Sequence, residues 1–114
     1  MELKKQSRKG PSASKKLSSR KKALLAVEAG RAAKAIDPVV LRVGNLVDYT
    51  DYFVIMSGES TVQVRAIFEN IWAMIAQSKS LPLAAEGEQE GRWVVVDWGD
   101  VVIHIFYQEL RDFY

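Results

Sequence analysis

The sequence predicts an α/β protein in which helices flank a mixed sheet. Near the C-terminus, two β-branched runs, residues 93–96 and 101–106, surround a turn in which Gly99 stands between aspartates, a pattern typical of an antiparallel hairpin. From Ser60 onward, apolar residues recur at spacings of three and four, which indicates an amphipathic helix. The predicted order along the chain is helix, strand, strand, helix, three strands and a final helix, and this order favours a mixed sheet.

The N-terminal elements follow from periodicity and from proline. The first helix is predicted over residues 22–36, where Asp37-Pro38 ends it because the residue before proline is pushed out of the α region. Its apolar stripe contains Leu25, Ala29, Ala32, Ala33 and Ile36. A strand should follow over residues 39–46, with a bulge or bend at Gly44-Asn45, then a turn over residues 48–51 and a buried strand over residues 52–56.

The second helix has a defined start. Ser60 and Gln63 fit a capping box, in which the hydroxyl and the amide satisfy two backbone donors. Its core face is predicted to contain Val64, Ile67, Phe68, Ile71, Trp72 and Ile75. A short strand around residues 83–85 and an acidic loop over residues 86–91 complete this region.

The hairpin is apolar on both faces. Alternation places Trp93, Val95 and Asp97 on one side and the set Val94, Val96 and Trp98 on the other. Either helices cover both sides, or one side is a docking surface. Residues 108–114 should form the opening turns of a last helix.

Charge is strongly segregated along the chain. Residues 1–22 carry nine Lys/Arg against Glu2 alone, or +8, while residues 23–114 carry seven Lys/Arg against thirteen Asp/Glu, or −6. We therefore predict a disordered basic tail over residues 1–22 and one α/β domain over residues 23–114, and we expect that removing the tail leaves the fold intact. An organelle transit peptide has a similar composition, but the apolar side of an amphipathic helix is missing, so a solvated tail is favoured. The opposite charges predict a polyanion as partner of the tail and a basic surface as partner of the domain.

Catalysis is not predicted. Gly58-Glu59-Ser60, between a strand and a helix, is where a nucleotidyltransferase would hold phosphate, but no carboxylate pair follows that could hold the metal ions of phosphoryl transfer. Asp97 and Asp100 are expected to accept hydrogen bonds in the hairpin turn rather than to bind metal. His104 is the only histidine, and we interpret it as hydrogen-bonded and half-buried. No cofactor or metal is predicted, and the absence of cysteine excludes disulfides.

Trp93 leaves two alternatives open. It is either a core side chain or the aromatic anchor of a protein interface, in which case the nearby acids form a charged rim. The acidic loop is by itself a solvated loop, but beside Trp93 it can complement Lys or Arg on a partner.

Three blocks of the sequence resemble the ribosomal silencing factor family, also called Iojap-related proteins. The family pattern G-x-W-x-x-x-D-x-G-D-V-x-x-H-x-F, followed by Arg and an aromatic pair, is matched here by Gly91, Trp93, Asp97, Gly99, Asp100, Val101, His104, Phe106, Arg111, Phe113 and Tyr114. The other blocks are residues 51–55 with Gly58, Ser60, Gln63 and Ala66, and the turn Glu86-Gly87-Glu88. The chain departs from the family at its C-terminus, because members usually run several residues past the aromatic pair.

The resemblance implies a nucleotidyltransferase-like fold with about five strands and a role without catalysis. Silencing factors bind the large ribosomal subunit through its fourteenth protein and sterically block joining with the small subunit, which represses translation when nutrients are scarce. We expect the partner-binding residues to be Glu86, Glu88, Trp93, Val95, Asp97 and Asp100. An active nucleotidyltransferase and a ribosome-assembly or RNA-binding module stay open as alternatives, as do a homodimer and weak rRNA contact through the tail. The expected location is the bacterial cytoplasm, or a plastid or mitochondrion if the tail is a transit peptide.

Overall fold

A five-stranded mixed sheet forms the centre of the fold in a computed structural model of the chain, which describes residues 17–80 and 82–111. The strand order is β2 (Ile36–Arg42), β3 (Tyr52–Gly58), β6 (Val101–Tyr107), β5 (Trp93–Asp97) and β4 (Ala84–Glu86). β3 and β6 are parallel, and the other neighbours are antiparallel. The predicted fold class, a mixed sheet of about five strands with helices, is confirmed.

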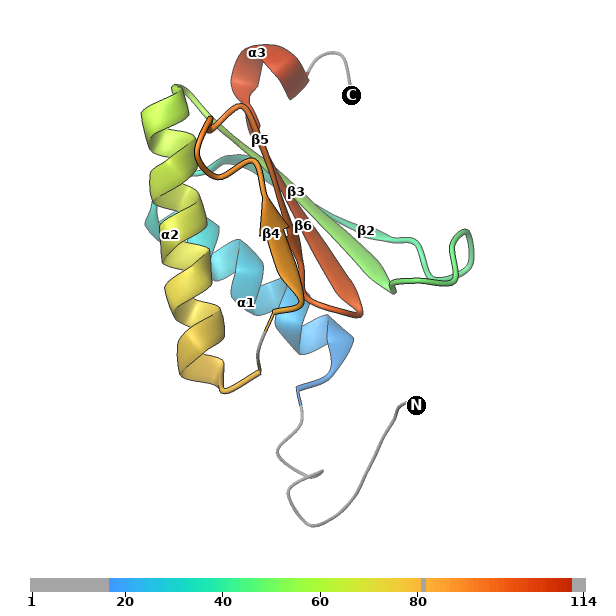
Figure 1. The fold of residues 1–114 in the computed structure, drawn as a ribbon. Coiled ribbons are helices and arrows are strands. Elements are labelled where there is room, and N and C mark those ends of the chain that lie inside the picture. Colours follow the sequence, from blue (N-terminus) through green and yellow to red (C-terminus); the bar gives the residue numbers. More distant parts are fainter. Residues whose placement is uncertain (1–16, 81, 112–114) are drawn as a thin grey trace.

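The two long helices lie on the same side of this sheet (Figure 1). They are α1 (Ser19–Ala32) and α2 (Thr61–Ser78), and a short α3 (Gln108–Arg111) follows directly after β6. Residues 112–114 of the predicted last helix lie outside the described residues. Within the described part of the chain, no helix is long and apolar enough to cross a membrane.

The first helix begins earlier than predicted. Ser18 caps it by accepting a hydrogen bond from the Lys21 N–H at 3.1 Å, so residues 19–22, predicted to be disordered, form its first turn. Leu17 also packs against the core. The predicted end of the disordered tail at residue 22 was therefore wrong, because a serine cap can start a helix inside a basic segment. Residues 1–16 of the predicted tail lie outside the described residues.

The helix also ends earlier, and the next strand is displaced accordingly. α1 stops at Ala32, Lys34 adopts a φ of 69°, and Ile36 begins β2 instead of ending the helix. Asp37, with a φ of 47°, lies at a register shift between Ile36 and Val39, which is a β-bulge in an edge strand. The prediction that Asp37-Pro38 terminates the helix was wrong, since proline is equally tolerated at a bulge of an edge strand.

The start of α2 confirms the predicted cap. The Ser60 hydroxyl accepts the Gln63 N–H at 3.1 Å, and the Gln63 side chain accepts the Glu59 N–H at 2.6 Å, one residue before the expected donor. On the core face, Val64, Ile67, Ile71 and Ile75 are fully buried, whereas Trp72 remains 37% exposed and packs against Phe68 with the two rings tilted.

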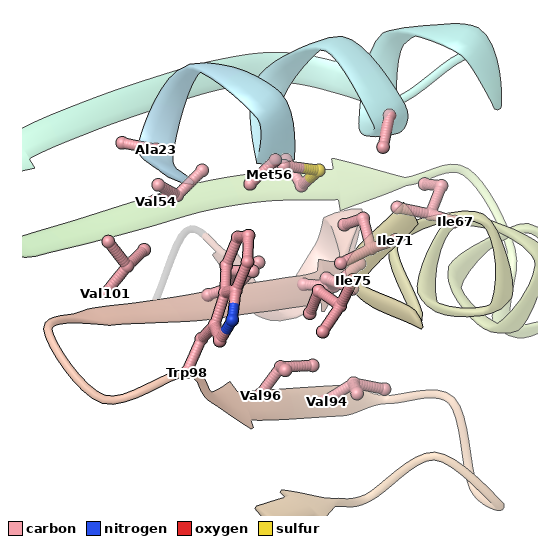
Figure 2. Packing of buried hydrophobic residues seen from close by; sticks show 14 of the residues in the cluster. Ala23, Val54, Met56, Ile67, Ile71, Ile75, Val94, Val96, Trp98 and Val101 are labelled. Atoms are coloured by element: carbon pink, nitrogen blue, oxygen red, sulfur yellow. The ribbon is translucent and has the colours of Figure 1, made fainter. Parts of the chain in front are cut away.

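The hydrophobic core fills the space between the helices and one face of the sheet. Figure 2 shows Trp98 pointing from the hairpin into this cluster, toward α1. Its indole N–H donates to the Ser80 carbonyl at 2.9 Å, which satisfies the polar group of an otherwise buried ring. The sheet supplies Val54, Met56, Val94, Val96, Val101, Ile103 and Ile105, and α1 supplies Ala23, Ala26 and Ala29.

The two aspartates at the turn between β5 and β6 have different partners. Gly99 adopts the predicted positive φ, 77°, and its N–H donates to the Asp97 carboxylate at 3.0 Å. Asp100 instead accepts the Lys22 ammonium at 2.8 Å. The prediction that the Asp100 side chain accepts a hydrogen bond within the turn was wrong. The first turn of α1, which was not predicted, brings the Lys22 ammonium within reach of the Asp100 carboxylate.

Candidate protein-docking face

The register determines which side chains share the face of the sheet opposite α1 and α2. Paired residues of neighbouring strands point to the same side, and residues alternate along each strand. Ile55 is paired with Val39 on one side and with His104 on the other, and His104 is paired with Val95. We call this surface the open sheet face; its members are Ile36, Val39, Leu41, Phe53, Ile55, Ser57, Ala84, Glu86, Trp93, Val95, Asp97, Val102, His104 and Phe106.

The open sheet face is largely apolar and partly accessible. Val39, Leu41 and Trp93 are exposed by 38%, 42% and 40%. Glu86 and Asp97 are the only charged residues that the described strands place on it, and both are acidic. Of the two alternatives left open by the hairpin, the first is wrong, because the long helices cover one side of the sheet only. That the other side is a docking surface stays a prediction.

An aromatic cluster forms the centre of the open sheet face. The Trp93 ring stacks on Phe106 with centroids 5.1 Å apart, and Phe53 meets His104 edge-on at 5.2 Å. The Trp93 indole N–H donates to His104 Nδ1 at 3.2 Å. These contacts fix Trp93 in place while leaving part of its ring accessible, which is the anatomy of an interface anchor.

His104 is neutral in this setting. Burial lowers the pKa of His104 from its ordinary value of 6.5. Because Nδ1 accepts the indole hydrogen bond, the ring proton of neutral His104 resides on Nε2. The predicted half-buried, hydrogen-bonded histidine is confirmed.

The structure brings together four of the six predicted partner-binding residues. Trp93, Val95, Asp97 and Glu86 lie on the open sheet face, and Glu86 ends β4, paired with Val95, instead of starting the acidic loop. Glu88 lies beyond the end of β4, in a turn whose Gln89 carbonyl accepts the Arg65 guanidinium at 3.2 Å.

Asp100 is separated from the four residues on the open sheet face. Its carboxylate contacts Lys22 of α1, on the helical side of the sheet. The structure therefore does not place Asp100 at the rim of the surface around Trp93.

Sequence reasoning assigned no docking role to the residues that β2, β3 and β6 contribute. Val39, Leu41 and Phe53 share the open sheet face with Trp93 although they are distant from it in the sequence. Period-two alternation of apolar residues was the available signal, but it could not say which face of each strand would remain uncovered.

The segment Gly58-Glu59-Ser60 behaves as a helix cap. The Ser60 hydroxyl is engaged by Gln63, as the simpler interpretation predicted. Among the described residues, no three His, Asp or Glu side chains gather closely enough to hold a metal ion.

Comparison with known proteins places this geometry in a family. A family model described as "Ribosomal silencing factor during starvation" matches residues 16–114. The chain belongs to this family. The silencing-factor resemblance of the hairpin and of the two upstream blocks is thereby confirmed.

Individual silencing factors and related proteins support the assignment. The ribosomal silencing factor of Halalkalibacterium halodurans is 36% identical over 91 residues, covering 79% of this chain and 77% of that protein. The mouse protein named "Mitochondrial assembly of ribosomal large subunit protein 1" is 38% identical over 87 residues, covering 74% of this chain and 38% of the mouse protein. A crystal structure of a Chromobacterium violaceum protein superposes with a TM-score of 0.84 at 28% identity, covering 86% of this chain and 82% of that one.

Proposed function

We propose that this silencing factor binds the large ribosomal subunit through its fourteenth protein and sterically blocks joining with the small subunit. By this action it represses translation when nutrients are scarce. The observation that carries the proposal is the open sheet face: an accessible apolar surface, centred on Trp93, in a domain whose family is named for the ribosome.

The chemistry of this face favours a protein partner with basic flanks. Apolar and aromatic side chains supply contact area, while Glu86 and Asp97 attract Lys or Arg at the edge. Glu88 adds a third acid at the end of β4. The −6 charge of residues 23–114 would repel RNA phosphate from the domain, which favours ribosomal protein over rRNA as the main contact.

The mechanism requires occupancy and no bond chemistry. A factor that covers a subunit interface prevents joining as long as its residence time exceeds the encounter time of the subunits. We therefore propose a factor without enzymatic activity, cofactor or metal.

Sedimentation with separated ribosomal subunits tests the proposal. Tagged protein should co-sediment with large subunits, be absent from small subunits, and reduce the joined fraction when both are mixed. A pull-down should capture the purified fourteenth protein. Equal sedimentation with both subunits, or joining that proceeds unchanged at saturating protein, would contradict the proposal.

The basic N-terminal segment supplies a second, weaker contact in this proposal. Residues 1–22 carry a net +8, which suits salt-sensitive binding to rRNA phosphate. Affinity of the full chain should fall more steeply with salt than that of a chain lacking residues 1–16.

Compartment and self-association complete the proposal. The family has bacterial and mitochondrial relatives, and we place this chain in the bacterial cytoplasm, or in a plastid or mitochondrion if the tail acts as a transit peptide. Light scattering on the purified protein measures its molar mass and so tests whether it forms a homodimer.

A further inference from the structure

His104 is the polar side chain at the middle of the open sheet face. In the sheet its direct neighbours are Ile55 of β3 and Val95 of β5, and along β6 they are Val102 and Phe106. Phe53 and Trp93 contact the ring as well. The described strands place two charged residues on this face, Glu86 on β4 and Asp97 on β5, and neither is directly paired with His104. A third charged group reaches the far end of the face from α3: the Arg111 guanidinium donates to the Ser57 hydroxyl at 2.9 Å, and Ser57 is paired with Phe106.

The contacts of His104 account for one ring nitrogen and leave the other available. Nδ1 accepts the Trp93 indole N–H at 3.2 Å, which places the proton of the neutral ring on Nε2. Within residues 17–80 and 82–111, no group is hydrogen-bonded to Nε2. At its centre, the open sheet face therefore presents the His104 Nε2–H as a donor surrounded by apolar and aromatic side chains.

We infer that the His104 Nε2–H is a recognition donor, which pairs with a carbonyl oxygen of the docked ribosomal protein. This inference rests on the proposed function and specifies its partner surface: apolar side chains around one exposed backbone carbonyl, with Lys or Arg outside them. Glu86 and Asp97 complement such basic flanks, and they oppose a phosphate as the acceptor.

The donor contributes specificity because docking removes it from water. A partner with a carbonyl at this position keeps the hydrogen bond, while one that offers only methyl groups leaves a buried N–H unsatisfied. Loss of one such hydrogen bond corresponds to roughly a tenfold loss of affinity.

Three substitutions at the same position separate recognition from packing. In His104→Gln the amide NH2 reaches the place of the imidazole Nε2, in His104→Asn it reaches only the place of Nδ1, and in His104→Leu no donor remains. We expect His104→Gln to bind the large subunit within about threefold of wild type, and His104→Asn and His104→Leu to bind about tenfold more weakly. Thermal melts on all three variants show whether a loss of binding affinity is caused by unfolding and not by the missing donor.

The pH dependence of binding tests whether docking requires the Trp93–His104 hydrogen bond, which leaves the proton of neutral His104 on Nε2. Protonation puts a hydrogen on Nδ1, opposite the Trp93 N–H, so that two donors face each other. Wild-type affinity should therefore fall as the pH drops from 7.5 to 5.5, whereas the affinity of His104→Gln should change less.

The tautomer itself can be measured without the ribosome. Long-range ¹H–¹⁵N spectra of the free protein should show the proton of His104 on Nε2. A proton on Nδ1 would overturn the inference, and so would wild-type affinity of His104→Leu while Trp93→Ala loses affinity, a result that leaves the proposed function standing. If wild-type protein fails to bind large subunits at all, the proposed function fails and this inference with it.

Discussion

Trp93 shows how one side chain serves the fold and the surface together. Its ring stacks on Phe106 and donates to His104, yet 40% of the residue stays accessible. The sequence left core and anchor as alternatives, and the structure places Trp93 on the sheet face away from the core cluster. Its stabilising contacts are therefore those of a surface cluster.

Trp93→Ala should weaken binding much more than folding. We expect a loss of about 2 kcal/mol or more of binding free energy, equivalent to roughly thirtyfold in affinity. The stacking and the indole hydrogen bond should contribute about 1–2 kcal/mol to the free energy of unfolding. Pull-down titration and denaturant melts on the same samples check both values.

Trp72→Ala is the matched control. Trp72 is 37% exposed and also packs against a phenylalanine ring, but it lies on α2, on the other side of the sheet. The Trp72→Ala variant should be less stable than wild type but should bind the large ribosomal subunit with unchanged affinity. Equal loss of binding in both variants would mean that Trp93 acts through the fold and that the contact lies elsewhere.

His104 should make stability depend on pH. Because its folded-state pKa lies below 6.5, the unfolded chain binds more protons in the window just under that value. The stability contributed by neutral His104 is full above pH 6.5 and is lost as the pH falls from 6.5 through the folded-state pKa. Denaturant melts between pH 7.5 and 5 should show wild type losing stability relative to His104→Gln; parallel curves would contradict this expectation.

At the scale of elements, the first turn of α1 connects the helix to the hairpin. Lys22 donates to Asp100 at 2.8 Å, and its ammonium lies 5.1 Å from the centre of the Trp98 ring. Ser18 caps the same turn. This arrangement revises the expectation that residues 1–22 can be removed without consequence.

Two truncations distinguish the tail from the helix start. Removal of residues 1–16 should leave the melting temperature nearly unchanged, because it keeps Leu17, the Ser18 cap and Lys22. Removal of residues 1–22 should cost about 2 kcal/mol, from the lost cap and the lost charge-assisted hydrogen bonds, and lower the melting temperature by roughly 10 °C. Identical melting of the two truncations would show that the first turn contributes nothing to stability.

A glycine holds the β4–β5 connection against α2. Gly91 has a φ of 72°, and a Cβ there would lie 2.6 Å from the Thr61 carbonyl oxygen. Only glycine permits both the conformation and the approach. The close contact between Gly91 and α2 positions the start of β5 at Trp93. The packing of α2 on one side of the sheet therefore helps to place Trp93 on the other side.

At the scale of the whole molecule, the acidic domain should steer association with a basic partner. Charge reversal at Glu86, on the open sheet face, should slow association by up to about fivefold at low salt, equivalent to about 1 kcal/mol. The effect should shrink as salt shortens the Debye length. Stopped-flow or surface-immobilised kinetics at two salt concentrations measure it.

Glu69→Lys provides the control for net charge. Glu69 is exposed on α2, away from the open sheet face, so its reversal makes the same change in total charge at a different place. It should affect association less than Glu86→Lys. Equal slowing by both would assign steering to the net charge of the domain instead of to this face.

The sequence by itself determined the elements with strong local signals. The capping box at Ser60, the positive φ at Gly99 and the hairpin were predicted because each depends on residues within a few positions of one another. Family membership followed from the same local blocks. The first helix was displaced because its cap, Ser18, lies in a segment whose composition resembles a disordered tail.

Only the tertiary structure decided which face of the sheet the long helices leave uncovered. Alternation indicated two apolar sides of the hairpin, but the side left open depends on where α1 and α2 pack, which is a non-local result. The same packing placed Asp100 beside Lys22, separating it from Trp93, and the parallel pairing of β3 with β6 brought Phe53 to His104. These contacts join residues about 50 to 80 positions apart, and because loop closure lets many such pairings compete, local pattern cannot choose among them.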